Sequence, residues 1–535
     1  MDNRFKKPIP ASEIKDRREA EEVKTDNPSE LTSNLVANLK LLRTLLGDSS
    51  DLVIRRFRLP SQPDLELACL FIDGLTNTDV IDRDIMQSLM HLSRIENFAD
   101  NINPSSALEM IEAHLLTVGE IKVATKLQEI LHAILSGDTI LLIKDSPKAI
   151  LVNSRGFPSR GVQEPNTEAV VRGPRDGFSE SLRINTALIR RRIKDPDLVV
   201  ESVTIGKRTA TDIAIIYIKD LANPKVVQEV KGRLSKVRID AILESGYIEQ
   251  LVQDRTMSPF PQMQATERPD KVAAGILEGR VAVVVDGTPF VLILPVVWAQ
   301  LFQSPEDYYE RTQLSTFIRL IRLLANTFSL FLPGIYIALT SFHPEMLPTS
   351  LAMALAAARA GVPFSILSET LIMEIAVEIV REASIRLPGP IGPTIGIVGG
   401  LILGEASVQA GIVSPLTVIV VAITAIGSLS TPNYSTALSV RLVRFLFIFL
   451  GASFGLIGIT TGAILLIVHL AGLESWGVPY LAPYAPYQPV GQGDTILRRS
   501  FPYQRTRPPF LKPLDEHRMP EDVDQKETAD ETSES

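Results

Sequence analysis

Lysine and aspartate are missing from long stretches of the second half of this 535-residue chain. No lysine lies between Lys271 and Lys512, and no aspartate lies between Asp307 and Asp494. On insertion scales, either side chain costs about 2.5–3.5 kcal/mol at the centre of a bilayer. The depletion therefore predicts that this part of the chain, up to a polar tail, is embedded in a membrane.

Cysteine is almost absent as well, because Cys69 is the only one in the chain. A disulfide scaffold is therefore excluded, and a reducing compartment is favoured. The six histidines are scattered without metal-ligand spacing, and the net charge of −8 argues against bulk binding of nucleic acid. Motifs of zinc proteases, P-loop proteins and serine hydrolases are missing too. We therefore expect neither an enzyme nor a bound metal or cofactor.

The N-terminal end carries no apolar run, so we expect no signal peptide and a cytoplasmic location for about the first 300 residues. Residues 1–28 are charged and lack periodicity, which is typical of a mobile tail. At about 150 residues per domain, the length predicts several domains.

Apolar patterns predict two α/β subdomains after this tail, at residues 29–155 and 156–305. In the first we expect strands at 52–59, 65–72 and 139–143, and helices at 29–46, 77–91, 104–116 and 119–135. In the second we expect strands at 168–172, 198–205, 213–218 and 237–243, helices at 180–193 and 222–235, and a membrane-proximal hairpin at 279–295. The helix at 222–235 lies between two expected strands with the spacing of a βαβ unit.

Five apolar segments of bilayer length are expected in a helical transmembrane bundle at residues 306–475. They lie at 320–339, 351–380, 391–411, 415–429 and 442–473. Flanking arginines indicate a cytoplasmic start, but five crossings would leave the basic C-terminal tail, residues 476–535, on the outer side. Either residues 351–380 form two half-spans, or another stretch re-enters the membrane, or the tail breaks the charge rule. From Glu521 onward the tail is acidic, and we expect it to be disordered.

Four glycines in the third segment recur at every fourth position: Gly392, Gly396, Gly400 and Gly404. Such spacing predicts close helix packing, with a transport path along the glycine face as the alternative. Glu405 follows directly and is the one charge of its segment. An intramembrane carboxylate indicates a proton or cation ligand, unless it lies near the outer interface.

The segment at 351–380 is interrupted by a glycine, a valine and a proline, with Val362 at the centre of the break. In its second half, Thr370, Glu374 and Glu378 fall within about 80° of one another on a helical wheel. With Glu369, three carboxylates lie where none can face lipid. One interpretation is a carboxylate-lined cation path, constricted at Val362. The other is internal pairing, of Glu378 with Arg381 and of Glu374 with Arg322 or another helix.

Seven segments are specific enough to resemble a known family. They are RGPRDGF (172–178), LIRRRIK (188–194), ESGYIEQL (244–251), PFPQMQATERPDKVAAGILEGRVAVVVDGT (259–288), FHPEMLP (342–348), REASIRLP (381–388) and IGIVGGLILG (395–404). In this order they resemble the A-subunit family of spore germinant receptors, which includes a close sporulation-protein relative.

The resemblance implies two cytoplasmic α/β subdomains and a membrane bundle in the inner membrane of bacterial spores. It also implies work with a permease-like B subunit and a lipoprotein C subunit, which together turn a nutrient signal into ion release. Oligomeric channel formation is implied for the family as well. We therefore expect a signal-transducing membrane subunit that forms or gates a cation channel as a homo-oligomer. The alternative is a non-conducting scaffold that couples a permease-like partner to cytoplasmic components.

Overall fold

The computed structural model describes residues 29–519, except 60–61, 93–107, 109, 113–115, 157–164, 166–167, 169 and 387–390. The chain divides into two compact units. The first holds residues up to 158 together with 193–199, and the second holds residues 159–192 and everything from 200 onward. The second sheet domain, the helix bundle and the C-terminal segment thus belong to one unit.

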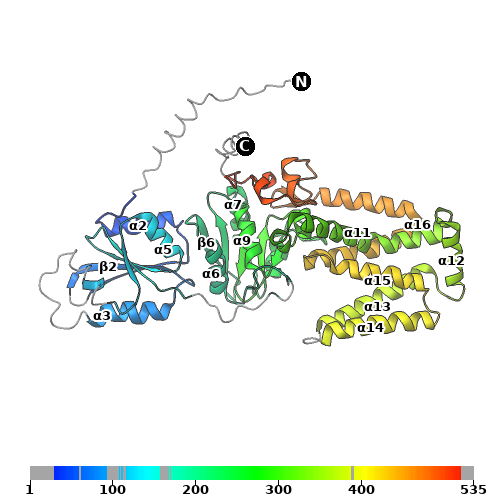
Figure 1. The fold of residues 1–535 in the computed structure, drawn as a ribbon, viewed down its shortest axis with the longest axis horizontal. Coiled ribbons are helices and arrows are strands. Elements are labelled where there is room, and N and C mark those ends of the chain that lie inside the picture. The colour runs from blue at the N-terminus through cyan, green and yellow to red at the C-terminus, as the bar shows by residue number, and fades with distance from the viewer. Residues whose placement is uncertain are drawn as a thin grey trace, which may run out of the picture. The chain divides into compact units, whose positions relative to one another are not determined.

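The first domain is a five-stranded antiparallel sheet in the order β1-β2-β4-β5-β3. Its strands are β1 (Leu52–Leu59), β2 (Gln62–Ile72), β3 (Ile121–Ala124), β4 (Thr139–Ile143) and β5 (Ala149–Val152). Its helices are α2 (Leu35–Leu45), a π-helical stretch (Val80–Gln87), α3 (Ser88–Leu92) and α5 (Leu127–Leu135). In Figure 1, α3 covers one face of the sheet and α2 and α5 cover the other.

Most of the expected elements of this domain are confirmed, and one is partly wrong. The expected helix at 119–135 begins only at Leu127, because Ile121–Ala124 pairs with β5 as an edge strand. Its two larger apolar side chains alternate with Lys122, which suits a strand with one face on the core. The expected helix at 104–116 lies largely outside the described residues.

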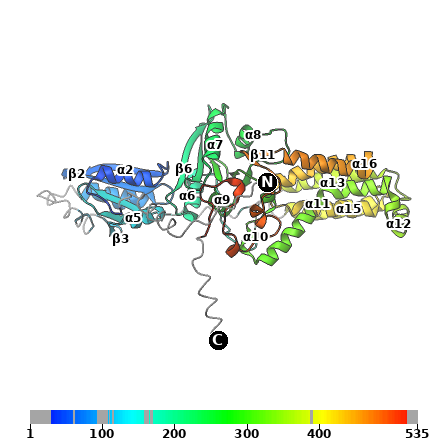
Figure 2. The same ribbon diagram turned by 90° about the horizontal axis from the view of Figure 1, so that it is seen from above.

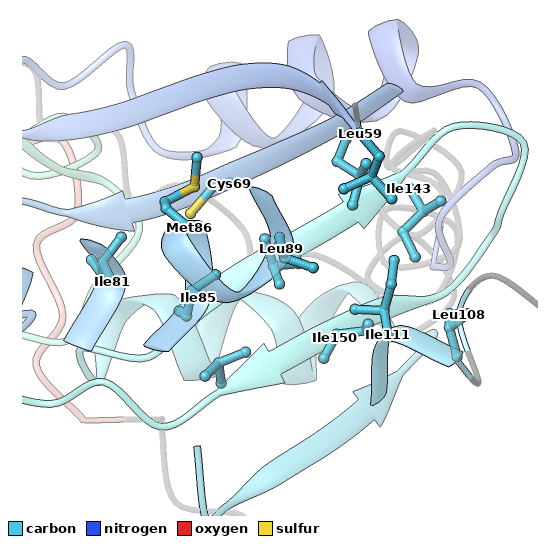
Figure 3. Close-up of a cluster of buried hydrophobic side chains, with 13 residues drawn as sticks. Leu59, Cys69, Ile81, Ile85, Met86, Leu89, Leu108, Ile111, Ile143 and Ile150 are labelled. Carbon is cyan, nitrogen blue, oxygen red and sulfur yellow. The ribbon is translucent and has the colours of Figure 1, made fainter. Parts of the chain in front are cut away.

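Thirteen buried side chains form the core on the α3 face of this sheet (Figure 3). Cys69, on β2, is among them and is fully buried. Burial raises the pKa of its thiol to about 12, so the thiol stays protonated at neutral pH. A buried thiol of this kind behaves as a small apolar side chain.

The second domain is another five-stranded sheet, in the order β6-β7-β9-β10-β8. Its strands are β6 (Leu198–Ile205), β7 (Thr211–Ile218), β8 (Gln264–Thr266), β9 (Val281–Val285) and β10 (Val291–Leu294). Its helices are α6 (Leu182–Arg192), α7 (Pro224–Lys236), α8 (Ser245–Val252) and α9 (Pro269–Leu277). The hairpin expected at 279–295 is confirmed by the antiparallel pairing of β9 with β10.

Two strands expected in this domain are wrong, and the βαβ unit with them. The described residues of 168–172 and the stretch 237–243 form no strand. The second stretch is held instead by loop hydrogen bonds, from Lys207 N to Ile239 O and from Arg208 N to Asp240 O. The strand β7 therefore pairs with β9, in antiparallel register.

The C-terminal part of the second unit is a bundle of helices. They are α11 (Thr312–Phe342), α12 (Thr349–Arg359), α13 (Ile366–Arg386), α14 (Ile391–Gln409), α15 (Pro415–Leu429) and α16 (Tyr434–Ala471). Among the described residues, α11 and α16 are long and apolar enough to cross a membrane, and α15 is a shorter apolar helix. Figures 1 and 2 show α11, α13, α15 and α16 side by side.

Helix α16 is a helical hairpin. At Gly455 the backbone has φ 59° and ψ −143°, a conformation that glycine adopts without steric cost. A Cβ at Gly462 would meet the side chains of Leu450 and Phe447, so the second half of α16 runs back along the first. The single crossing expected at 442–473 is therefore wrong.

This reversal changes the odd number of helical segments that the sequence predicted for the bundle. Residues at both ends of α16 contact the sheet domain: Ser439 donates a hydrogen bond to the carbonyl oxygen of Pro259, and His469 lies 3.0 Å from the Ser258 hydroxyl. Gly455, between them, packs on His343 at the far end of α11. Counting α11, α13, α14, α15 and the two halves of α16, the bundle has six antiparallel legs. An even number returns the chain to the sheet domain.

The segment after α16 folds back on the second domain. Trp476 and Tyr480 are buried, and the Tyr480 hydroxyl donates to the carbonyl oxygen of Pro261 at 2.8 Å. Farther on, Leu514 N donates to the carbonyl oxygen of Leu221 at 3.0 Å. Residues 476–519 are thus a packed part of the domain, while the disorder expected from residue 521 onward lies outside the described residues.

Candidate functional site

The helix α13 follows the break at residues 360–365 and carries the three predicted carboxylates. Ser365 accepts a hydrogen bond from Ser368 N at 3.2 Å, which satisfies one of the free N–H groups at the start of the helix. From this start, Glu369 and Glu374 point into the bundle and are almost fully buried, whereas Glu378 is partly exposed. Each carboxylate forms an ion pair with at least one arginine.

Glu369 is saturated with hydrogen bonds. Its Oε1 accepts from Arg359 Nε at 3.2 Å and Nη2 at 3.1 Å, and its Oε2 accepts from Ser414 N at 3.0 Å and Thr417 Oγ1 at 3.1 Å. Ser414 is the N-cap of α15. The carboxylate therefore lies at the positive end of that helix and ties α12, α13 and α15 together.

Glu374 pairs with a residue of the first half of α16. Arg444 Nη1 lies 2.7 Å from Glu374 Oε2, and Arg444 Nη2 donates to the hydroxyl of Ser329 on α11 at 2.9 Å. Both charged side chains are buried. Glu374 Oε1 and Arg444 Nε have no hydrogen-bond partner within the described part of the chain. This ion pair is therefore close but incompletely satisfied.

Glu378 bridges two arginines. Arg381, three residues later on α13, lies 3.1 Å from Oε1, and Arg441 on α16 lies 3.2 Å from Oε2. Four guanidinium groups thus face three carboxylates, a net charge of 4 − 3 = +1. Removing one partner of a buried pair leaves an uncompensated charge, so these pairs hold α12, α13 and α16 in one arrangement.

Of the two ion pairs that the sequence suggested, the structure contains one. Glu378 does meet Arg381, but Arg322 does not reach Glu374. Arg322 binds Asp307 instead, at 3.0 Å, and the carbonyl oxygen of Phe302. The sequence left the actual partner open as another helix, and nothing local in the chain points to Arg444, which lies 70 positions away.

The predicted constriction residue lies in the turn before α13. Val362 is half-buried between α12 and α13, where its N–H donates to Arg359 O at 3.0 Å. Thr370 is buried, and its hydroxyl donates to the carbonyl oxygen of Ile366 at 2.8 Å. The roles of Val362 and Thr370 in gating stay predictions.

The glycine stripe lies on α14. Gly392 and Gly396 belong to the stretch whose side-chain surroundings lie outside the described residues. A Cβ at Gly400 would meet no described atom within 4 Å, and one at Gly404 would lie 3.3 Å from Val418. Glu405 is exposed and accepts a hydrogen bond from Gln409 Nε2 at 3.0 Å. A packing role for the stripe in an assembly stays a prediction.

The closest helix contacts involve glycines that the sequence did not single out. A Cβ at Gly334 would lie 2.6 Å from the carbonyl oxygen of Phe447, and one at Gly451 would overlap the carbonyl oxygen of Gly334. Gly427 meets the backbone of Ala325 in the same way. Glycines in apolar helices were the available signal: Gly451 and Gly455 are four residues apart, whereas Gly334 and Gly427 are isolated.

A second charged cluster joins the bundle to the sheet domain. Asp307 forms ion pairs with Arg319 at 2.9 Å and with Arg322 at 3.0 Å. Arg319 also forms an ion pair with Asp494 of the C-terminal segment at 2.9 Å. The Tyr308 hydroxyl donates to Asp494 at 2.7 Å. Burial raises the pKa values of both Asp494 and Tyr308. The cluster was missed because Asp494 lies 175 positions from Arg319 in the chain.

Arg268, Asp270 and Asp286, three charged residues of the string at 259–288, form contacts within the protein. Arg268, almost fully buried, contacts Asp270 at 2.8 Å and donates to the carbonyl oxygens of Glu168 and Pro174. Asp286 accepts from Leu182 N at 2.9 Å, at the start of α6. No group of three or more potential metal ligands occurs within the described ranges.

A model of the Bacillus/Clostridium GerA spore germination protein family matches residues 40–510. The chain belongs to this family. Spore germination protein KA of Bacillus subtilis is 42% identical over 93% of this chain and 90% of the relative, and spore germination protein GerLA of Bacillus cereus is 40% identical over 91% and 97%. Stage V sporulation protein AF of Bacillus subtilis is 30% identical over 89% and 94%. Membership supports a role in spore germination.

A solved structure also matches, that of the N-terminal domain of the A subunit of the Bacillus megaterium spore germinant receptor GerK3. It is 39% identical and covers 50% of this chain and 98% of that structure, with a TM-score of 0.41.

Proposed function

We propose that this family member is the A-type subunit of a spore nutrient-germinant receptor in the spore inner membrane. In this proposal it transduces germinant binding into ion release by forming or gating an oligomeric cation channel. The observation that carries the proposal is α13, where Glu369, Glu374 and Glu378 lie inside an apolar bundle and are held by arginines of other helices. Charges at that depth are costly and are retained where ions or protons move.

The arrangement of the bundle supports the topology of this proposal. Six antiparallel legs would bring the N-terminal domains and the C-terminal segment to the same side of the membrane, which we propose is the spore core. The basic tail then obeys the charge rule. The permease-like and lipoprotein partners belong to the same proposal.

The non-conducting scaffold remains a second candidate, and one observation favours it. All three α13 carboxylates are paired within a single chain, so none is free to bind a passing cation. Conduction therefore requires that the Arg444–Glu374 or Arg441–Glu378 contact opens. A scaffold requires that both stay closed.

Purified protein in liposomes with a potassium gradient distinguishes the two candidates. Under the channel proposal the parent protein conducts, Val362→Ala leaks more, and Glu374→Gln with Glu378→Gln conducts less. Glu345→Gln, at an exposed carboxylate, is the control and should match the parent. Assembled protein that carries no ion flux, alone and with its partner subunits, would favour the scaffold.

A further inference from the structure

A cavity separate from the α13 ion pairs lies where three parts of the second unit meet. These parts are the sheet domain, the connector to the bundle (residues 295–311) and the C-terminal segment (residues 476–519). It contains about 1210 Å³ of empty space, part of it open to solvent. Its polar wall comes from β8 and the connector, through Gln264 and Gln300, and its aromatic wall from Tyr308, Tyr309 and Phe501. We call it the amide cavity. Three parts of one unit therefore line a single space.

Two glutamine side chains in the amide cavity are hydrogen-bonded to each other on one side only. Gln300 Nε2 donates to Gln264 Oε1 at 3.0 Å. Gln264 is fully buried, yet its Nε2 has no hydrogen-bond partner among the described residues, and neither has the buried Oε1 of Gln300. Buried polar atoms are nearly always satisfied. The pair thus presents one unused donor and one unused acceptor.

A neighbouring glutamine in the same wall, Gln303, uses its amide N–H group within the protein. Gln303 Nε2 donates to Asp494 O at 2.6 Å, and its Oε1 lies 3.3 Å from the Tyr308 hydroxyl oxygen. Its amide donor is therefore used by the protein itself. The contrast marks the amides of Gln264 and Gln300 as groups that are left for a ligand, beside the buried Nε of Arg518, which also lacks a partner among the described residues.

The charged groups around the amide cavity are already compensated. Lys271 pairs with Glu168 at 2.5 Å, and Asp270 pairs with Arg268 at 2.8 Å. On the tail side, Arg518 pairs with Glu278 at 2.7 Å, and Arg507 pairs with Asp515 at the same distance. Glu278 also pairs with the buried Arg280, at 3.3 Å. Every charged side chain that lines the cavity is thus engaged in an ion pair, and a charged ligand would have to compete with one of these contacts, so the cavity favours an uncharged one.

The aromatic wall presents ring surface rather than hydroxyl groups. The Tyr309 hydroxyl donates to Asp270 at 2.6 Å, and the Tyr308 hydroxyl donates to Asp494 at 2.7 Å. Because both hydroxyls are held by carboxylates, the rings are fixed and line the cavity with ring atoms. The guanidinium groups of Arg319 and Arg498 lie over the Tyr308 ring, 5.3 and 5.7 Å from its centroid, so only part of that ring is left for packing. Pockets with an apolar wall and a few convergent polar groups are typical of small-molecule sites.

We propose that the amide cavity binds an uncharged small molecule with a carboxamide or lactam edge on a planar body. The carbonyl oxygen of the ligand accepts from Gln264 Nε2, and its N–H donates to Gln300 Oε1. The planar body packs against Tyr308, Tyr309 and Phe501. Because the walls come from three parts of the unit, a bound ligand holds the C-terminal segment and the connector into α11 against the sheet domain. This goes beyond the proposed function and does not depend on ion conduction.

Benzamide is the test probe, applied to the full-length protein in detergent, with binding followed by ligand-observed NMR titration. Benzoate and benzyl alcohol are matched controls, because the first adds a charge and the second lacks the amide. We expect millimolar affinity for so small a probe. Gln264→Met and Gln300→Met should each weaken benzamide binding at least tenfold, and Phe501→Ala should weaken it severalfold. Gln250→Met, at an exposed glutamine of α8, should leave it unchanged.

Three results would overturn the proposal. The first is the absence of benzamide binding up to its solubility limit. The second is equal binding of benzamide, benzoate and benzyl alcohol. The third is benzamide binding that survives Gln300→Met, a change at a half-buried side chain that the fold should tolerate. Gln300→Met also keeps the test decisive if Gln264→Met lowers the yield of folded protein.

Discussion

In the first sheet domain, the thirteen core side chains are all apolar or a protonated thiol, whereas the bundle buries the carboxylates of Glu369 and Glu374, each paired with an arginine. The sheet core is stabilised by removing apolar surface from water, which is not directional. Between helices in lipid that driving force is missing, because lipid is as apolar as the helices. In the membrane location that we propose, close backbone contacts and directed polar pairs must hold the bundle instead. We therefore expect the two regions to respond differently to substitution.

The largest effect is expected at a glycine contact of the bundle. Gly451→Leu should abolish assembly, because even a Cβ at this position overlaps the carbonyl oxygen of Gly334 and would separate α11 from α16. The yield of monodisperse protein in detergent measures it. Gly232→Leu, in α7 outside the bundle, is the control, since a Cβ there meets no described atom within 4 Å. Equal yields for the two variants would show that this contact does not hold the helices.

The next effect tests the directed polar pairs. Arg444→Leu should destabilise the bundle by about 3–5 kcal/mol, because it leaves the Glu374 carboxylate buried without its partner. Thermal unfolding in detergent measures the change. The double variant Glu374→Leu with Arg444→Leu should recover most of the loss, since two apolar side chains then replace the pair. A double variant as unstable as the single one would mean that lost packing, rather than an unpaired charge, causes the effect.

The stability of the sheet core should depend on the volume of its side chains rather than on the direction of polar contacts. Leu141→Ala, at a fully buried position of β4, should cost about 2–5 kcal/mol through lost burial and a cavity. Leu141→Met, which conserves volume, should cost less than about 1.5 kcal/mol. Hydrogen exchange of the β2 and β4 amides in the full-length protein reports both. If Leu141→Met exchanges as fast as Leu141→Ala, the core depends on shape as strictly as the bundle does.

The smallest effect concerns an acid in the second sheet domain. Burial, with a contribution from Glu244, raises the pKa of Glu249 to about 7. The folded state therefore keeps a proton that the unfolded state releases above about pH 4.5, so this contribution to stability is full below that pH and is lost as the pH rises to about 7. Glu249→Gln should raise stability at pH 8 by about 1–2 kcal/mol, allowing for partial exposure of the side chain.

Unfolding midpoints between pH 5 and 8 test this prediction. The difference between Glu249→Gln and the parent should grow with pH across that window. Glu129→Gln, at an exposed carboxylate of α5, should give a curve parallel to that of the parent. A constant difference for Glu249→Gln would show that the side chain is already ionised in the folded protein at pH 5.

The antiparallel fold shows where sequence patterns stop being informative. Strands such as Thr139–Ile143 and Val281–Val285 are short apolar runs, so local patterning was enough to find them. The stretch 237–243 was expected as a strand too, but it pairs with no strand, and its carbonyl groups at Ile239 and Asp240 accept hydrogen bonds from the loop after β6. A strand needs a paired neighbour as well as a suitable composition, and only the tertiary structure decides which segments pair.

Composition by itself determined that the chain has an apolar helical part, because excluding lysine and aspartate from lipid is a property of single residues. It also determined that α13 must hide its carboxylates. Only the tertiary structure decided that Arg444 receives Glu374, that α16 turns back at Gly455, and that Gln264 meets Gln300. These are contacts between residues that are distant in the chain. Solvation acts on each side chain separately, whereas a partner is fixed only when the whole chain has packed.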